Sequence, residues 1–500
     1  MEIPSILPVI PVAAAGLAAI GIWINGDKTF WRNLWSTLAS VVAFLAIISM
    51  VPAALDHKIH VANILNMGGL TLTLRVDDLG LVFGMVSSSM WLLVNIYAIG
   101  YMEHEHAKQR FFAFFALSMF SAFGIAFAEN LFAFFIFYEM LSLATYPLVI
   151  HEETPEAMKA GSKYLIYTLG GGGCLLVAII ITYFVTGNIS LDSAGIFSIT
   201  DGTGLLRALF FLYLIGFGVK AGIMPMHQWL PSAMVAPTPV STLLHAVAVV
   251  KAGAFGILRL VYNIYGVDLM AKLGLGTVLA FIASFTIVTA SIIAIRQDNL
   301  KRRLAYSTIG QLSYIVLGAA LLAPAAAIGA MVHIANHAFT KGTLFMCAGI
   351  IAEETGVKNI SQMNGMGRRL PLTMTAFTIG AFGMIGLPPL AGFMSKWYLG
   401  VGAGQSHQPI FMLVLVTSSI LNSIYFLPII YRAFFAKTTE QEDKVLKRPK
   451  DRLRAETVWL MLVPIMATTV MSVILGIFTT APGLPMSIAK LATAFLVGGK

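Results

Sequence analysis

The stretch Gly218–Gly253, GVKAGIMPMHQWLPSAMVAPTPVSTLLHAVAVVKAG, decides the fold because it places charged and helix-breaking residues inside long apolar runs. Lys220 and Lys251 lie near its two ends, and Pro225 interrupts a pattern that is otherwise helical. The flanking residues are almost all apolar. Such surroundings are typical of membrane-spanning helices, so both lysines are expected to lie within a membrane.

The composition of the whole chain supports this interpretation. Its 500 residues are 58% hydrophobic and 11% charged, whereas a soluble protein carries about 25% charged residues. We predict an all-α polytopic membrane protein. The formal charge of +9 would indicate nucleic acid in a soluble chain, but in a membrane protein basic residues mainly record orientation, so no nucleic-acid partner is expected.

The two cysteines argue against several kinds of cofactor site. Cys174 and Cys347 lie far apart and have no CxxC partner, so a disulfide framework, a zinc site and a cysteine-ligated cluster are all disfavoured. We expect no metal, no cofactor and no redox centre in this chain. Catalytic domains for redox or nucleotide chemistry would belong to other chains.

Fourteen segments are apolar and long enough to cross a membrane, which takes about 20 residues. They are residues 3–24, 33–55, 79–101, 111–128, 130–150, 163–185, 206–235, 240–262, 271–295, 303–323, 326–352, 371–403, 409–433 and 457–478. The seventh and twelfth are too long for one straight crossing and contain Pro225, or Pro388 and Pro389, so we predict broken helices there. The whole chain, 1–500, is predicted to form one membrane domain.

Basic residues between these segments fall mostly on one side. Odd-numbered loops contain twenty Lys or Arg residues, and even-numbered loops contain only Lys58, Arg75, Arg207 and Lys272. The positive-inside rule therefore predicts odd loops in the cytoplasm and both termini outside. The start MEIPS lacks a base before the apolar run, so we interpret 3–24 as a retained helix and not a signal peptide. The hydrophilic segment 436–456 is predicted to be a cytoplasmic loop, with a partner-docking surface as the alternative.

Several charged residues remain inside the predicted helices. Arg259 lies near a helix end, and we expect it to extend to the membrane surface. The others cannot all do so, and each costs roughly 2.5–3.5 kcal/mol at the membrane centre. They are Glu139, Lys220, Lys251, Lys341 and Lys396. An ion pair between Glu139 and one lysine could serve packing alone, but surplus buried amines that gain and lose protons near neutral pH indicate a proton relay.

Histidines extend the set of titratable groups. His333, His337 and Lys341 are spaced i, i+4 and i+8, which places them along one helix face. A metal or haem site is a weaker interpretation, because the third group is a lysine and no carboxylate or cysteine completes a ligand set. His245 and His227 are additional relay candidates. The glycine run 170–173 lacks the lysine of a phosphate loop and is interpreted as a helix-packing feature.

The two halves of the chain repeat some of these features. GIMP at 222–225 and GLPP at 386–389 each interrupt a helix close to a lysine, and KYLIYTLG at 163–170 is echoed by RRLAYSTIG at 302–310. This pattern predicts two inverted five-helix repeats, 111–262 and 271–433, with a path along the membrane midplane.

These residues resemble a known family, the antiporter-like subunits shared by Mrp-type sodium/proton antiporters, respiratory complex I and membrane-bound hydrogenases. The resemblance is carried by FYEMLSLATYPLV at 137–149, KAGIMPMHQWLPSAMVAPTPVSTLLHAVAVVKAG at 220–253, DNLKRRLAYSTIGQLSYIVLG at 298–318, HIANHAFTKGTLFMCAGI at 333–350 and GLPPLAGFMSKW at 386–397. It implies that Glu139 pairs with Lys220, that Lys251 links the halves, and that Lys396 is the terminal group. His333, His337 and Lys341 would form the central relay.

The resemblance also implies a place in a larger assembly. Lys396 is a glutamate in one complex I member, and the chain ends about 20 residues after the last predicted helix, without the long extension of two other members. These features favour the D-type Mrp subunit in a prokaryotic cell membrane, where a proton gradient drives sodium outward with other membrane subunits as partners. A shorter subunit of a complex I-like or hydrogenase complex is the alternative.

Two interpretations from other classes stay open at this point. A stand-alone secondary transporter of a solute also uses broken helices and inverted repeats, but would need few intramembrane lysines. A membrane-embedded enzyme, such as an acyltransferase that uses His245 or His333, would retain activity without Lys220.

Overall fold

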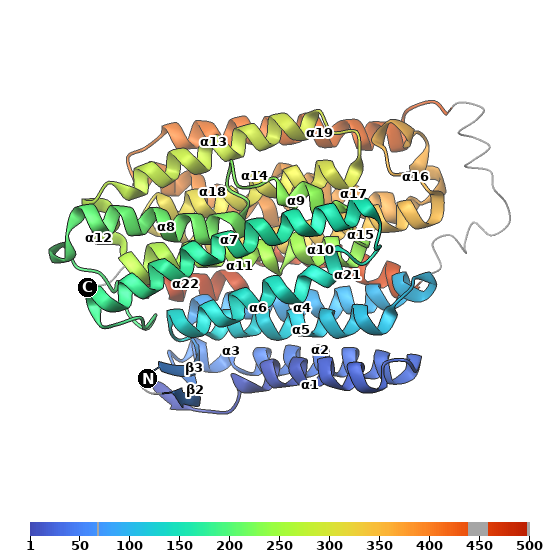
Figure 1. Cartoon of the computed structure of the whole chain (residues 1–500). Coiled ribbons are helices and arrows are strands. Elements are labelled where there is room, and N and C mark those ends of the chain that lie inside the picture. The colour runs from blue at the N-terminus through green and yellow to red at the C-terminus, as the bar shows by residue number, and fades with distance from the viewer. Residues whose placement is uncertain (68–69, 439–458, 498–500) are drawn as a thin grey trace.

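The computed structural model describes residues 1–67, 70–438 and 459–497, and its long helices run side by side in one bundle (Figure 1). Within these residues, ten helices are long and apolar enough to cross a membrane by length and composition. The chain is therefore a multi-pass, mostly helical membrane protein, as predicted. Of the predicted loop 436–456, all but the first three residues lie outside the described residues.

A small sheet at the N-terminal end was not predicted. Strand β1 (Glu2–Pro4) pairs in parallel with β2 (Ile59–Met67), which pairs antiparallel with β3 (Leu70–Val76). The alternation of Leu and Thr in LTLTLRV is typical of a β-strand. Because β1 takes up residues 2–4, the first helix, α1 (Val9–Asn25), begins later than residue 3, and α2 (Thr29–Ser49) and α3 (Val51–Leu55) follow it.

The first half of the bundle contains the predicted break in the seventh span and a second break that was not predicted. Its elements are α4 (Asp78–Tyr101), α5 (Lys108–Phe127), α6 (Leu131–Val149), α7 (Pro155–Thr186), α8 (Thr203–Ala221), α9 (Trp229–Ser232), α10 (Thr238–Ala246), α11 (Val249–Arg259) and the π-helix η4 (Leu260–Tyr265). Segment 240–262 was expected to be one helix, but Val247 and Ala248 leave helical geometry between α10 and α11. Lys251 consequently lies in the first turn of α11 and not at the midpoint of a continuous helix.

The second half follows the prediction more closely. Its elements are α12 (Val267–Lys272), α13 (Leu275–Ile295), α14 (Leu300–Ala320), α15 (Pro324–Thr355), α16 (Met366–Arg369), α17 (Pro371–Ile385), α18 (Ala391–Gln405), α19 (Ile410–Phe434), α21 (Trp459–Ile477) and α22 (Pro485–Leu496). Short 3-10 turns lie at Met102–His104, Ile199–Asp201, Ala233–Val235 and Ile360–Gln362. The twelfth span is broken between α17 and α18, as predicted, whereas α22 was missed because it has only 12 residues. The inverted relation of repeats 111–262 and 271–433 stays a prediction.

Helix α15 occupies the centre of the bundle. It packs against α4, α10, α14, α17, α18, α21 and α22, and every residue from Gly329 to Ile351 is buried. In Figure 1, α1 and α2 form one edge of the bundle and α13 and α19 form the opposite edge. The sheet and α12 lie at one end of the helices, which we call the sheet end, and α16 lies at the other end. The polar residues of α15 between Gly329 and Ile351 are thus enclosed by protein on all sides.

Candidate functional site

Glu139 and Lys220 form the predicted pair between α6 and the last turn of α8. Lys220 Nζ lies 3.7 Å from Glu139 Oε1, donates a hydrogen bond to the Tyr138 carbonyl, and lies 3.3 Å from the centre of the Tyr138 ring. Lys220 is fully buried, whereas the Glu139 side chain is 17% exposed. The ammonium therefore depends on a carboxylate, a carbonyl and an aromatic face of α6, and weakening any of them destabilises its charged form.

Gly172 of α7 lies directly against this pair. A Cβ atom at Gly172 would come within 2.4 Å of Glu139 Oε1, whereas Cβ atoms at Gly170 and Gly173 would meet nothing within 4 Å. Gly171 packs on Val219 of α8, where an added Cβ would lie 3.1 Å away. The glycine run therefore serves helix packing at one position, as predicted, and makes room for the Glu139 carboxylate at the next.

Lys251 and His337 connect the two halves of the chain. Lys251 Nζ lies 2.9 Å from His337 Nδ1, within hydrogen-bonding distance, and both residues are buried. The unpredicted break between α10 and α11 determines where Lys251 lies along its helix axis. The other ring nitrogen of His337, Nε2, has no hydrogen-bond partner among the described residues. An imidazole with one bonded and one free nitrogen is suited to receive a proton on one side and release it on the other.

His333 lies one helical turn from His337 on α15. The two ring centres are 5.9 Å apart, and His333 Nδ1 lies 2.8 Å from Ser395 Oγ on α18. The ring of Tyr314 stands edge-on to His333 with centres 5.4 Å apart. His333 thus extends the buried polar line from α15 toward α18.

Lys341 occupies the other end of the same helix face. Its Nζ donates to Ser307 Oγ at 2.6 Å and to the Leu304 carbonyl at 3.3 Å, both on α14. No carboxylate lies within ion-pair distance of Lys341 in the described part of the chain. Two neutral oxygens therefore bind this amine, and the centre of the Phe426 ring lies 5.8 Å from it.

Lys396 lies on α18, just after the second predicted break. Its Nζ donates to the carbonyls of Met384 and Ile385 at 3.0 and 2.7 Å and to Ser419 Oγ at 3.1 Å. The carbonyls belong to the last turn of α17, which has no further helical turn to satisfy them. The break in the helix thus creates the binding site for the lysine, since the negative end of α17 points at an ammonium group.

His245 and His227, the two additional candidates, make fewer contacts. His245 is fully buried in the last turn of α10, packs on the Phe345 ring at 4.7 Å between centres, and has no hydrogen-bond partner on either ring nitrogen among the described residues. The His227 ring lies 6.0 Å from that of Tyr306. The structure therefore places His245 beside α15, whereas His227 lies near α14 in the first broken helix.

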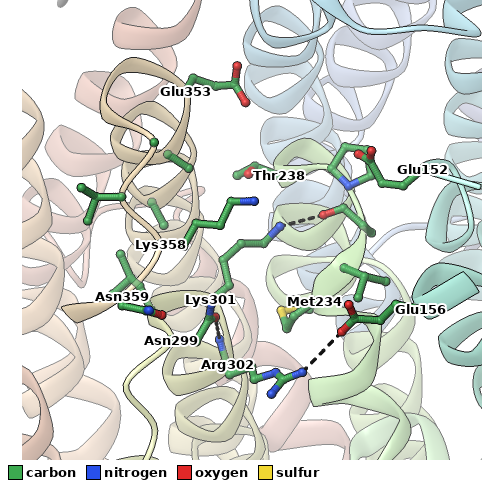
Figure 2. A pocket seen from close by; sticks show the side chains of 18 of the residues that line it. Glu152, Glu156, Met234, Thr238, Asn299, Lys301, Arg302, Glu353, Lys358 and Asn359 are labelled. Atoms are coloured by element: carbon green, nitrogen blue, oxygen red, sulfur yellow. Dashed lines mark hydrogen bonds and ion pairs between the residues drawn. The ribbon is translucent and has the colours of Figure 1, made fainter. Parts of the chain in front are cut away.

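A cavity of about 900 Å³ opens at the end opposite the sheet. Acidic groups Glu105, Glu152, Glu156 and Glu353 and basic groups Lys301, Arg302 and Lys358 line it. Figure 2 shows the ion pair between Arg302 and Glu156 (3.7 Å) among the lining side chains. Lys301 donates a hydrogen bond to the Ala236 carbonyl at 2.7 Å. Because the first turn of α10 forms part of its wall, the cavity leads toward the helix that carries His245.

Two histidines lie in the loops beside this cavity. The rings of His106 and His151 stack with centres 4.6 Å apart, and neither ring nitrogen of His151 has a hydrogen-bond partner among the described residues. Burial lowers the pKa of His151 to about 4. This residue is therefore neutral at physiological pH.

Arg259 does not extend to the membrane surface as predicted. It is only 2% exposed and forms an ion pair with Asp77, donating from Nη2 to Oδ1 at 2.8 Å and from Nη1 to Oδ2. Burial alone would raise the pKa of Asp77, but the Arg259 guanidinium, together with Arg75 and the Gly80 amide, holds that pKa below its ordinary value. The prediction was wrong because the partner lies 182 residues away in sequence.

The groups that contact the candidate residues were largely missed by sequence reasoning. Tyr138, Ser307, Ser395 and Ser419 supply oxygen atoms to the buried lysines and to His333. Serine is common in membrane helices, so only the adjacency of Tyr138 to Glu139 offered a signal. Among the described residues, no group of three or more His, Cys, Asp or Glu side chains is placed to hold a metal ion.

Two family models match the sequence. The model described as NADH:quinone oxidoreductase/Mrp antiporter, TM, matches residues 128–422, and that described as NADH-Ubiquinone oxidoreductase (complex I), chain 5 N-terminus, matches residues 65–112. The first match covers more than half of the chain and includes every candidate relay residue.

Curated relatives come from three kinds of complex. The chain is 35% identical to NADH-quinone oxidoreductase subunit N of Desulforudis audaxviator (strain MP104C), over 77% of this chain and 78% of the relative. It is 29% identical to a probable K(+)/H(+) antiporter subunit of Rhizobium meliloti (strain 1021), over 92% and 46%, and 32% identical to hydrogenase-4 component B of Escherichia coli (strain K12), over 65% and 50%. The chain thus spans about half the length of the last two.

Two solved structures share the fold. A chain of the Mrp complex from Dietzia sp. DQ12-45-1b superposes with a TM-score of 0.86 at 22% identity, over 98% of this chain and 97% of that one. A chain of the membrane-bound sulfane sulfur reductase, an archaeal respiratory membrane complex, gives 0.84 at 23% identity with the same coverage. At these identities the likeness concerns the fold alone.

Proposed function

We propose, from the premise that this chain belongs to the NADH:quinone oxidoreductase/Mrp antiporter family of membrane subunits, that it moves protons through the membrane as one subunit of a multisubunit complex. The observation that carries the proposal is the contact between Lys251 and His337, because it joins titratable groups of both halves into one buried line. That line runs from Glu139 and Lys220 through α15 to Lys396.

The pair Glu139–Lys220 acts as the switch of the relay. While the carboxylate stays close, it stabilises protonated Lys220; when the pair separates, the buried ammonium loses its counter-charge and releases its proton toward Lys251. His337, His333 and Lys341 then pass protons along α15, and Lys396 exchanges with the outer side. His245, on the helix whose first turn lines the large cavity, supplies protons from the opposite side.

The finer assignment is the D-type Mrp subunit, which exchanges sodium for protons in a prokaryotic cell membrane with both termini outside. It is supported by lysine at position 396 and by the 29% identity to the Rhizobium meliloti antiporter subunit over 92% of this chain. The partners are the other membrane subunits of that complex. A complex I-like subunit is the second candidate, favoured by the 35% identity to the NADH-quinone oxidoreductase relative over 78% of its length.

Transport in everted membrane vesicles tests the proposed function. A dye that reports internal pH follows proton movement after sodium is added, with the chain co-expressed with the subunits encoded beside it. Glu139→Ala and Lys220→Ala should abolish sodium-dependent proton movement, and Lys159→Ala, on the exposed side of α7, should leave it unchanged.

Two outcomes redirect the proposal. Full transport by Lys220→Ala would refute the relay. Proton movement that follows NADH or hydrogen oxidation and ignores sodium would assign the chain to the redox-driven candidate.

A further inference from the structure

Arg259 lies between the relay and the sheet end of the bundle. It is eight residues beyond Lys251 on α11, roughly 12 Å along the helix. The π-helix η4 continues from Arg259 to Tyr265, which lines a second cavity of about 340 Å³ with Gly266 and Asp268. Along this helix, the Arg259 guanidinium therefore lies between Lys251 and this cavity at the sheet end.

The guanidinium ties together segments that are distant in sequence. Besides the two bonds to Asp77, Nη1 donates to Asn263 Oδ1 at 3.1 Å, and the amide of Asn263 donates to the carbonyls of Leu191 and Ser193 at 3.0 and 3.2 Å. Asp77 also caps α4 by accepting from the Gly80 amide at 2.9 Å. α4, α11, η4 and the loop after α7 thus meet at one buried charge pair.

The chemistry of this cluster differs from that of the relay. A guanidinium is always protonated in proteins and cannot hand on a proton, and its fixed positive charge repels an approaching proton, as arginines do in selective pores. In the opposite direction along the chain from Lys251 lies His245, whose two ring nitrogens have no hydrogen-bond partner among the described residues. Protons can therefore reach Lys251 from the side of His245, whereas the Arg259 side lacks a group that can pass on a proton.

We propose that the Arg259–Asp77 pair is a proton-tight seal that separates Lys251 from the sheet end, so that a proton on Lys251 cannot leave in that direction and passes on through His337. This inference rests on the proposed relay. Without such a seal, the first half of the chain would let protons cross directly, and transport would no longer be coupled to events at Lys396.

Passive proton leak measures the seal directly. The assembled complex is reconstituted in liposomes with a pH gradient and no sodium or reductant, and proton influx is followed with a trapped pH dye. Arg259→Gln should raise the leak clearly above that of the unmodified complex, because it removes the fixed positive charge. Arg207→Gln removes an exposed arginine of α8 at the sheet end and should leave the leak at the level of the unmodified complex. Arg259→Lys, which keeps a charge, should leak less than Arg259→Gln.

The route of the leak distinguishes a broken seal from a damaged protein. In Arg259→Gln combined with Lys251→Met the leak should disappear; if it persists, protons bypass Lys251 and the proposal is overturned. If Arg259→Gln fails to assemble, Asp77→Asn with Arg259→Gln, which leaves no unpaired charge, should leak in the same way. If Arg259→Gln assembles and leaks no more than Arg207→Gln, the proposed seal is overturned. Failure of the proposed relay is distinguishable, because driven transport would then survive in Lys220→Ala.

Discussion

Replacing Gly172 by Ala perturbs the switch pair without touching either charged residue. The added Cβ would lie 2.4 Å from Glu139 Oε1, and ordinary contact begins at about 3.4 Å, so the carboxylate must move by about 1 Å. Alanine favours the helix over glycine by about 1 kcal/mol. We therefore expect a folded protein whose Glu139–Lys220 distance has changed.

The size of the effect follows from Coulomb's law. At an effective dielectric constant of about 20, charges separated by the observed 3.7 Å attract by about 4.5 kcal/mol, and at about 4.7 Å by about 3.5 kcal/mol. A difference of about 1 kcal/mol changes the closed-to-open equilibrium of the pair about fivefold. Because the relay needs both states, we expect sodium-dependent proton transport to fall by about that factor.

Matched controls lie in the same glycine run. Gly170→Ala and Gly173→Ala carry the same gain in helix propensity, but their Cβ atoms meet nothing within 4 Å. The vesicle assay should show normal rates for both controls and a reduced rate for Gly172→Ala at equal expression. Equal rates in all three variants would mean that the position of the Glu139 carboxylate does not limit transport.

Three further predictions address other stations and the surrounding loops. In the same vesicle assay, Lys251→Ala should abolish driven transport and Lys159→Ala should not. Transport that survives in Lys251→Ala would contradict the proposal that Lys251 connects the two halves of the relay. Ser307→Ala removes the hydroxyl that accepts a 2.6 Å hydrogen bond from the Lys341 amine. Since such a bond contributes about 1–1.5 kcal/mol, transport should slow about 5–10-fold. Ser307→Thr, which keeps a hydroxyl, should restore the rate, and equal rates for the Ala and Thr variants would contradict this role. His151 is neutral in the fold with a pKa of about 4 and about 6.5 when unfolded, so stability is full above about pH 6.5 and falls by up to about 3 kcal/mol as pH drops toward 4. Thermal unfolding in detergent should show this loss weakened in His151→Phe, and an unchanged pH profile would exclude His151 as its source.

Most of the helices could be predicted from the sequence because a membrane span is recognisable by its length and apolar composition. The breaks at Pro225 and at Pro388 could be predicted because proline interrupts a helix. The break between α10 and α11 falls in Ala246–Val249, where neither proline nor glycine marks it. It depends on the packing of α10 and α11 against distant helices, which no local pattern records.

Charge in an apolar context identified the candidate residues, and the family resemblance that they carried is confirmed. Their partners were less accessible to prediction. Ser307 and Ser419 look like any helical serine until α14 or α19 is placed beside a lysine. Arg259 was misjudged for the same reason, since its position near a helix end suggests exposure unless Asp77 is known to face it.

The continuity of α15 has a consequence for where the protein can regulate transport. His333, His337 and Lys341 lie on one unbroken helix of 32 residues, so their mutual separations are fixed by the helical repeat and hardly change when neighbouring helices move. The groups before and after them, Lys220, Lys251 and Lys396, all lie beside interruptions in α8, α10–α11 and α17–α18. In the proposed relay, the timing of each transport cycle is therefore set at the two ends of the path, while its middle keeps a constant spacing.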